Sequence, residues 1–225
     1  MARSGLGSAL LVPVLAACLS PGPRLADDEI SDRGLWLPEG ARAGMFVTWR
    51  HEGDGPVAVT TLACVAETAD TVTMEERETS RDGSTTVTAA RFSRDGAMLR
   101  AWRGSGGGPG TPLRIVPSKS VEEMGAEADR AARAIGASTK DAKARTETTR
   151  ETIDTPAGPF ECDVRRIRVS MLFASGETAT WWARTPLPLT RAVKIEERGP
   201  GSYRRVELLE AYGRRGAKPT LRIPD

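Results

Sequence analysis

The residues of this sequence that could do chemistry are one histidine, three cysteines and a few adjacent pairs of acidic residues. His51 is the only histidine, so the chain has no two-histidine metal site. A Ser-His-Asp triad would use this one histidine and leave no second histidine as a base. We expect His51 on a turn, exposed to solvent. Neighbouring residues on a strand point to opposite faces, so the acidic pairs cannot converge as general acid and base. These pairs are Asp27-Asp28, Glu75-Glu76 and Glu196-Glu197. With no Cys-x-x-Cys or other zinc spacing, we expect no catalytic residues, no metal site, no cofactor and no enzyme activity.

One cysteine is placed for a different chemistry. Residues 6–17 are apolar or small apart from one serine and one proline. That run is too short for a membrane span of roughly 20 residues but has the proportions of a signal-peptide core. It ends in Leu15-Ala16-Ala17-Cys18, which resembles the lipobox read by the bacterial lipoprotein signal peptidase. The resemblance implies that the Cys18 thiol is diacylated, that residues 1–17 are then removed, and that the new amino terminus can be acylated. The alternatives are an ordinary secretory signal cut after Ala17 or Ala26, or a coincidental cysteine.

A lipid on Cys18 would decide where the protein resides. Each buried methylene contributes about 0.8 kcal/mol, so two or three chains such as palmitate hold a protein on a membrane. Residues 19–26 are rich in Pro and Gly and predict a flexible spacer, within a linker that we place at 18–42. Leu19 follows the cysteine where an Asp would signal retention in the inner membrane of enterobacteria. The sequence therefore favours the periplasmic side of the outer membrane in a Gram-negative cell envelope.

Two cysteines remain, an even number that would allow one disulfide. Cys64 and Cys162 each lie in an apolar, strand-like segment, and disulfides persist in an oxidising compartment. They could pair as a disulfide. They could equally be two separate buried thiols, because free cysteine is among the most buried residue types.

Composition narrows the class of partner. The chain of 225 residues has a formal net charge of +2, or +1 without residues 1–17, which carry only Arg3. Charges of both signs are interspersed, which is typical of a solvated surface. A near-neutral balance argues against nucleic-acid binding, which usually needs a strongly basic face. Partners are thus expected to be the membrane, through the lipid anchor, a lipid or acyl-chain ligand, and an envelope protein.

The pattern of the chain after residue 44 predicts an antiparallel meander. Apolar residues alternate in short segments separated by turns such as Asp82-Gly83, which favours hairpins over βαβ units. The expected strands are 45–50, 57–66, 70–79, 85–92, 97–103, 146–154, 160–169, 179–184, 192–198 and 203–212.

The segments between and around these strands carry weaker signals. We expect 27–44 to be a loop or short helix that plugs the domain with Trp36 and Leu37, and 104–110 to be a flexible Gly-rich loop. A helix is expected from Ser120 to Gly136, because Ser120 and Glu123 have capping-box spacing and an apolar face follows. Residues 214–225 are a basic tail to which we assign no structure.

Several motifs of residues 43–213 resemble a known group of envelope proteins. They are the turn and strand Thr155-Pro156-Ala157-Gly158-Pro159-Phe160-Glu161-Cys162, the pair Trp181-Trp182, the segment 186–195, and the early strand 45–50. The group resembles, more distantly, the outer-membrane lipoprotein carrier and receptor proteins (LolA and LolB). The resemblance implies a mainly β (α+β) fold: an incomplete antiparallel barrel, or curved sheet, with one or two helices and an apolar concave face that takes up acyl chains.

Two functions follow from these expectations. The first is a lipid-anchored binding protein that holds acyl chains or another amphiphile in an apolar concavity. The candidate lining residues are Trp49, Val59, Met74 and Trp182. The alternative is a structural or interaction lipoprotein with a filled core and no small-molecule ligand. An arginine run (Arg165, Arg166 and Arg168 with Arg204 and Arg205) could contact lipid phosphates, but alternating charge on an outer sheet face also explains it.

Overall fold

The computed structural model describes residues 25–120, 143–171 and 174–223, together with Glu123, Ala126 and Arg130. Cys18, the predicted signal peptide and most of the predicted helix lie outside the described residues. Ser120 and Glu123 are described, and they form the predicted capping box: the Glu123 carboxylate accepts the Ser120 amide at 2.7 Å, and the Glu123 amide donates to Ser120 Oγ at 3.1 Å. Glu123, Ala126 and Arg130 are helical, and the rest of the predicted helix stays a prediction.

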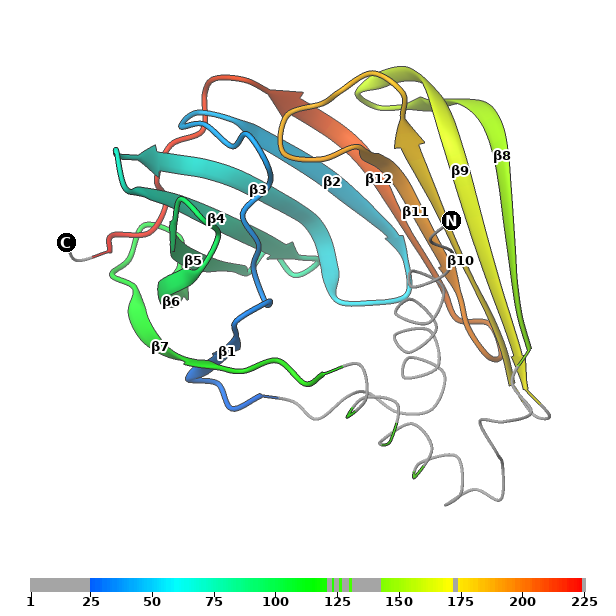
Figure 1. Cartoon of the computed structure of the whole chain (residues 1–225), viewed down its shortest axis with the longest axis horizontal. Coiled ribbons are helices and arrows are strands. Elements are labelled where there is room, and N and C mark those ends of the chain that lie inside the picture. Colours follow the sequence, from blue (N-terminus) through cyan, green and yellow to red (C-terminus); the bar gives the residue numbers. More distant parts are fainter. Residues whose placement is uncertain are drawn as a thin grey trace, which may run out of the picture.

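Twelve strands in the described residues form one large, curved, open sheet (Figure 1). Its order is β1-β7-β6-β5-β4-β3-β2-β12-β11-β10-β9-β8, and only the β1–β7 pair is parallel. The strands β2 to β7 form one meander and β8 to β12 form a second, and the two join where β12 pairs with β2. The strands are β1 (Glu29–Ser31), β2 (Phe46–Gly53), β3 (Val57–Glu67), β4 (Thr71–Ser80), β5 (Thr85–Ser93), β6 (Met98–Ser105), β7 (Thr111–Val116), β8 (Lys143–Thr155), β9 (Gly158–Met171), β10 (Ala174–Ala183), β11 (Ala192–Arg198) and β12 (Arg204–Gly213).

Short turns make the meander possible. Gly83 and Gly96 have φ of 86° and 91°, a left-handed backbone that side chains with a Cβ avoid. Each follows an aspartate at the tip of a hairpin, Asp82 between β4 and β5 and Asp95 between β5 and β6. The predicted antiparallel meander is therefore confirmed, and the protein is mainly β.

A single large apolar cluster packs against one face of the sheet. Its largest fully buried members are Leu35, Leu62, Met74, Phe92 and Leu209, from five separate segments of the chain. Residues that pair directly across strands share a face, so Val47, Leu62 and their neighbours mark the inner face of β2 and β3. At the β8–β9 turn, the Ala157 amide donates to the Leu209 carbonyl of β12 at 3.3 Å. This contact joins the β8–β9 hairpin to β12, although β10 and β11 separate β9 from β12 in the sheet.

The C-terminal segment packs on the opposite face. Leu221 is buried against Val87, Ala89 and Trp102, which form a second, smaller apolar cluster. Figure 1 shows this red segment turning back from the end of β12 along the sheet. The sequence assigned no structure to residues 214–225, and the structure adds that Leu221 is buried on an apolar patch of the sheet.

The Gly-rich loop also differs from its prediction. The amides of Gly107 and Gly110 donate to the carbonyls of Thr220 and Arg222, at 2.9 Å each. The loop is thus hydrogen-bonded to the C-terminal segment rather than flexible, and β7, which the sequence analysis did not predict, follows it. The partners of this loop lie more than a hundred residues away in the chain, so the local sequence could not predict these hydrogen bonds.

The segment before β2 contains a strand instead of a helix. Residues 29–31 form β1, whose backbone pairs in parallel with β7. The plug residue is Leu35, with 1% of its surface exposed, whereas Trp36 is 50% exposed. Leu37 packs against the core as expected. This segment therefore covers the core as predicted, but its fully buried residue is Leu35 and not Trp36.

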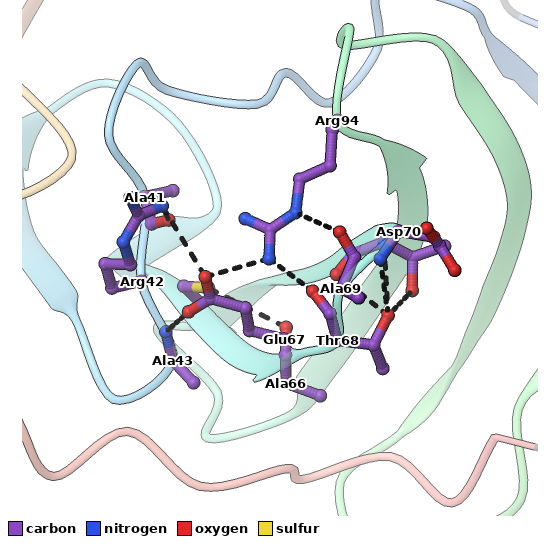
Figure 2. A network of polar contacts seen from close by, with 11 residues as sticks. Ala41, Arg42, Ala43, Ala66, Glu67, Thr68, Ala69, Asp70 and Arg94 are labelled. Carbon is purple, nitrogen blue, oxygen red and sulfur yellow. Dashed lines mark hydrogen bonds and ion pairs between the residues drawn. The ribbon is translucent and has the colours of Figure 1, made fainter.

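A polar network fastens three loops at one end of the sheet (Figure 2). The Glu67 carboxylate accepts the Ala43 amide at 3.1 Å and pairs with Arg94 at 3.0 Å and Arg42 at 3.5 Å. Arg94 also donates to the carbonyls of the β3–β4 turn, at Thr68 and Ala69. The Ala43 amide and the two arginines hold the pKa of Glu67 below its ordinary value. The network ties the segment before β2 to the turns that end β3 and β5.

Candidate functional site

His51 lies in β2 and is buried, not on a solvated turn as predicted. Its Nε2 is 2.8 Å from Thr60 Oγ1, and its Nδ1 is 3.4 Å from the Arg205 guanidinium. Since the guanidinium can only donate, Nδ1 accepts and Nε2–H donates to the threonine. Burial, helped by Arg205 and Arg81, lowers the pKa of His51 to about 4. The ring is therefore a neutral structural group at pH 7. The prediction failed because β2 extends through Gly53.

Carboxylates gather on the inner face near His51. Glu207 pairs directly with His51 across β12 and β2, and Glu76 pairs with Leu62 across β4 and β3. Burial, with repulsion from Glu78 and Glu207, raises the pKa of Glu76 to about 7. Burial also raises the pKa of Glu207. Glu75 points to the other face, as the alternation of a strand requires, so the adjacent pair Glu75-Glu76 does not converge.

The two cysteines are free and buried. Burial raises the pKa of Cys64 to about 11 and also raises that of Cys162. Of the two alternatives left by the sequence, the structure holds two separate buried thiols rather than a disulfide. Both stay protonated at neutral pH and belong to the main apolar cluster.

The four candidate lining residues do not gather around one cavity in the described structure. Trp49 and Met74 belong to the main cluster, with 8% and 0% of their surfaces exposed. Val59 pairs with Arg50 and so faces away from the core side of β3. Trp182 is half-buried and pairs with Asp163. Their types suggested one apolar surface, but the register places Val59 on the other face and fills the core with Trp49 and Met74.

Four of the five arginines in the predicted charged run are in ion pairs. Arg166 pairs with Glu151 at 2.6 Å, Arg205 with Glu207 at 2.7 Å, and Arg204 with Glu196 at 3.3 Å. Arg168 pairs with Glu177. Alternating charge along neighbouring strands therefore explains most of this run.

Trp181 lies between two cations. Lys194 Nζ is 4.2 Å and the Arg166 guanidinium carbon 5.4 Å from its ring centroid, while its Nε1–H donates to Glu151 at 2.9 Å. Burial opposes ionisation of Glu196, yet its hydrogen bonds to Arg198 and Lys194 lower its pKa to about 2. The polar groups around Trp181 and Glu196 thus supply hydrogen bonds and counter-charges to one another, as is typical of a structural network.

The two larger of the hollows found in the described surface are lined by cations. One, of about 430 Å³, lies over the ends of β8 to β11 and includes Arg145, Arg168, Glu177 and Arg198. The other, of about 570 Å³, lies between the outer face of β2 to β4 and residues 216–220. Arg77 and Lys218 are its cations, and Thr48, Thr61 and Thr220 supply its hydroxyls.

Sequence reasoning did not single out Arg77, Lys218 or Thr220. Lys218 and Thr220 lie more than a hundred residues from Arg77 and reach it only because the C-terminal segment folds back on the sheet. Arg77 sits in a charged strand, Glu75-Glu76-Arg77-Glu78, in which nothing marks it as different from its neighbours. No local signal could have found this hollow.

The described residues contain no group of three His, Cys, Asp or Glu side chains able to hold a metal ion. Within the same residues, no helix is long and apolar enough to cross a membrane.

No protein-family model matches this chain, and no curated protein matches it. Solved structures give weak similarities. A hypothetical protein from Chlamydia trachomatis has a TM-score of 0.45 and 9% identity, over 83% of this chain and 94% of that one. A protein of YmcC-like fold from Bacteroides fragilis, inferred to be exported, has a TM-score of 0.33 and 13% identity, over 80% and 99%. A protein from Parabacteroides distasonis, inferred to be a lipoprotein, has a TM-score of 0.33 and 11% identity, over 76% and 96%. Similarities this low support no transfer of fold family or function.

Proposed function

We propose that this protein is a lipid-anchored component of the bacterial cell envelope that faces the periplasm from the outer membrane and acts by binding rather than catalysis. The observation that carries the proposal is Leu15-Ala16-Ala17-Cys18 at the end of a short apolar run. A diacylated and N-acylated Cys18 would hold the domain at the membrane surface, since two or more chains are needed for stable anchoring. Residues 19–26 would act as a spacer.

Binding is favoured over catalysis by the state of the chemically capable side chains. His51 is neutral and held by Thr60 and Arg205, and both described cysteines are buried thiols with raised pKa. A nucleophile or base needs access to substrate and a pKa near the working pH. His51, Cys64 and Cys162 are buried and lack that access.

The ligand is proposed to bind outside the filled core, as a soluble molecule or an envelope protein partner. Trp49 and Met74 support this view because they are packed into the main cluster. The competing proposal is an acyl chain in the concavity of a LolA/LolB-like half-barrel. It requires this packed core to open, or a space beyond the described residues.

Intact-mass spectrometry of the full chain tests the anchor. The chain, expressed with its own leader in a Gram-negative host and purified in a non-ionic detergent, should have the mass of residues 18–225 plus a diacylglyceryl group and one further acyl chain. Cys18→Ala should abolish both the added lipid and the cleavage before residue 18. An unlipidated wild-type chain cut after Ala17 or Ala26 would refute the proposal.

Native mass spectrometry of the same preparation separates the two kinds of ligand. Co-purifying lipid that is lost on Trp182→Glu, but kept on Leu99→Glu, would support the acyl-chain proposal. Leu99 is a suitable control because it is a large apolar residue that is 49% exposed. A protein that stays ligand-free when lipid is added would support the filled-core proposal.

A further inference from the structure

The larger hollow is built from one row of the sheet and one distant segment. Thr48, Thr61 and Arg77 pair directly across β2, β3 and β4, so their side chains leave the sheet on the same outer face. Thr48 Oγ1 and Thr61 Oγ1 are 3.1 Å apart. Residues 216–220 line the other side and bring Lys218 and Thr220 to this row.

Glu75 holds that segment in place. Its carboxylate accepts the Thr220 amide at 2.9 Å and the Leu221 amide at 3.1 Å, and Leu221 fills the small apolar cluster beside it. Glu75 lies on the same face as Arg77, two residues away, yet its oxygens are used by backbone donors. The Glu75 carboxylate therefore binds the backbone of the C-terminal segment and forms no ion pair with Arg77.

Arg77 forms no ion pair with any carboxylate of the described residues. Its Nη2 donates to the hydroxyl of Thr220, a neutral acceptor, and its buried Nε has no hydrogen-bond partner. Buried polar groups are nearly always satisfied, and an unsatisfied one in a native structure requires an explanation. A missing acceptor in the hollow is the simplest physical explanation. Lys218 adds a second, exposed cation that no described carboxylate pairs with.

We propose that this hollow binds a phosphate group, either free or as the monoester of a small polar molecule. A phosphate carries about 1.5 to 2 negative charges at pH 7 and three strong acceptor oxygens. Two cations and three hydroxyls match that charge and number of acceptors. A guanidinium can donate two parallel hydrogen bonds to phosphate, and Arg77 lines the hollow without a carboxylate paired to it. The volume of about 570 Å³ exceeds that of orthophosphate and leaves room for a substituent beside Phe46 and Pro219.

The smaller hollow, lined by Arg145, Arg168 and Arg198, is less suited to binding an anion. Arg168 is paired with Glu177 and Arg198 with Glu196, so two of its three arginines already have a carboxylate. An incoming anion would have to displace those carboxylates.

The inference rests on the proposed binding function, and its test is separate from that of the anchor. The full lipoprotein in phosphate-free, non-ionic detergent is titrated by calorimetry at pH 7.5 and low salt. The probes are inorganic phosphate, O-phosphoethanolamine and, as a control, ethanolamine. We expect saturable binding of the two phosphates and none of ethanolamine. Equal affinity for both would identify free phosphate as the ligand, and tighter binding of phosphoethanolamine would identify a substituted monoester such as a lipid headgroup.

Variants decide whether the binding occurs in this hollow. Removing a charged hydrogen-bond partner from a bound anion costs about a tenfold to hundredfold loss of affinity, which we expect for Arg77→Met. Lys218→Ala, at an exposed position, should weaken binding several-fold. Arg100→Met, at an exposed arginine of β6, should change nothing.

Each unfavourable result is informative. Absence of saturable phosphate binding by the wild-type chain would overturn the inference, as would unchanged affinity in Lys218→Ala and Thr61→Val. The latter pair decides the matter if Arg77→Met does not fold. None of these results bears on lipidation, since the intact mass reports the anchor independently.

Discussion

Glu76 should make the protein less stable as the pH rises, and replacing it with Gln should remove this effect. Its carboxyl lies on the inner face of β4, where burial and two neighbouring carboxylates raise its pKa to about 7 from an ordinary value of 4.5. The folded state therefore keeps a proton that the unfolded state releases. Stability from this group is fully present below pH 4.5 and is lost as the pH rises through 7.

The size of the effect follows from the pKa shift. Each pKa unit corresponds to about 1.36 kcal/mol, so the difference between 4.5 and 7 amounts to about 3 kcal/mol. Glutamine has the shape of the protonated acid but cannot ionise. Glu76→Gln should thus match the wild type near pH 4.5 and exceed its free energy of unfolding by up to about 3 kcal/mol at pH 8.

Urea denaturation at pH 4.5, 6, 7 and 8, followed by tryptophan fluorescence, measures this difference. The quantity of interest is the variant's free energy of unfolding minus that of the wild type, which cancels the titration of all other groups. Glu52→Gln, at an exposed glutamate of β2, is the control and should show no trend with pH. A difference for Glu76→Gln that is the same at pH 4.5 and pH 8 would refute the assigned pKa and the burial that causes it.

Two further predictions follow from the described contacts. His51 has the opposite pH dependence: its pKa of about 4 in the folded state lies below the ordinary 6.5, so its stability is lost as the pH falls from 6.5 to 4, by about 3 kcal/mol. His51→Gln should remove that loss in the same denaturation series, and a variant that keeps the wild-type acid slope would contradict it. Glu75→Ala should release the C-terminal segment, because two backbone amides lose a charged acceptor at a cost of about 1.5 to 3 kcal/mol each. Hydrogen exchange at the Gly107 and Arg222 amides should then accelerate at least tenfold, whereas Glu76→Gln, on the other face, should leave both rates unchanged.

The local pattern of the sequence determined most of the strands and their connection as an antiparallel meander, whereas the pairing of β12 with β2 was not predicted. Alternation of apolar residues and turns such as Asp82-Gly83 are local properties, and they reappear at nearly the predicted bounds in β3, β5 and β11. The capping box at Ser120 and Glu123 is equally local and was confirmed. The lipobox resemblance at Cys18 is also read from contiguous residues and stays a prediction.

Tertiary structure alone decided which side chains meet. The strand register placed Val59 away from Trp49 and Met74, and the extension of β2 buried His51. The return of the C-terminal segment brought Lys218 and Thr220 to Arg77. A one-residue shift of register reverses the face of every side chain in a strand, and contacts across more than a hundred residues depend on how whole strands pack. The sequence by itself determined most of the strands and the predicted anchor. The candidate site at Arg77 exists only because residues far apart in the chain pack together.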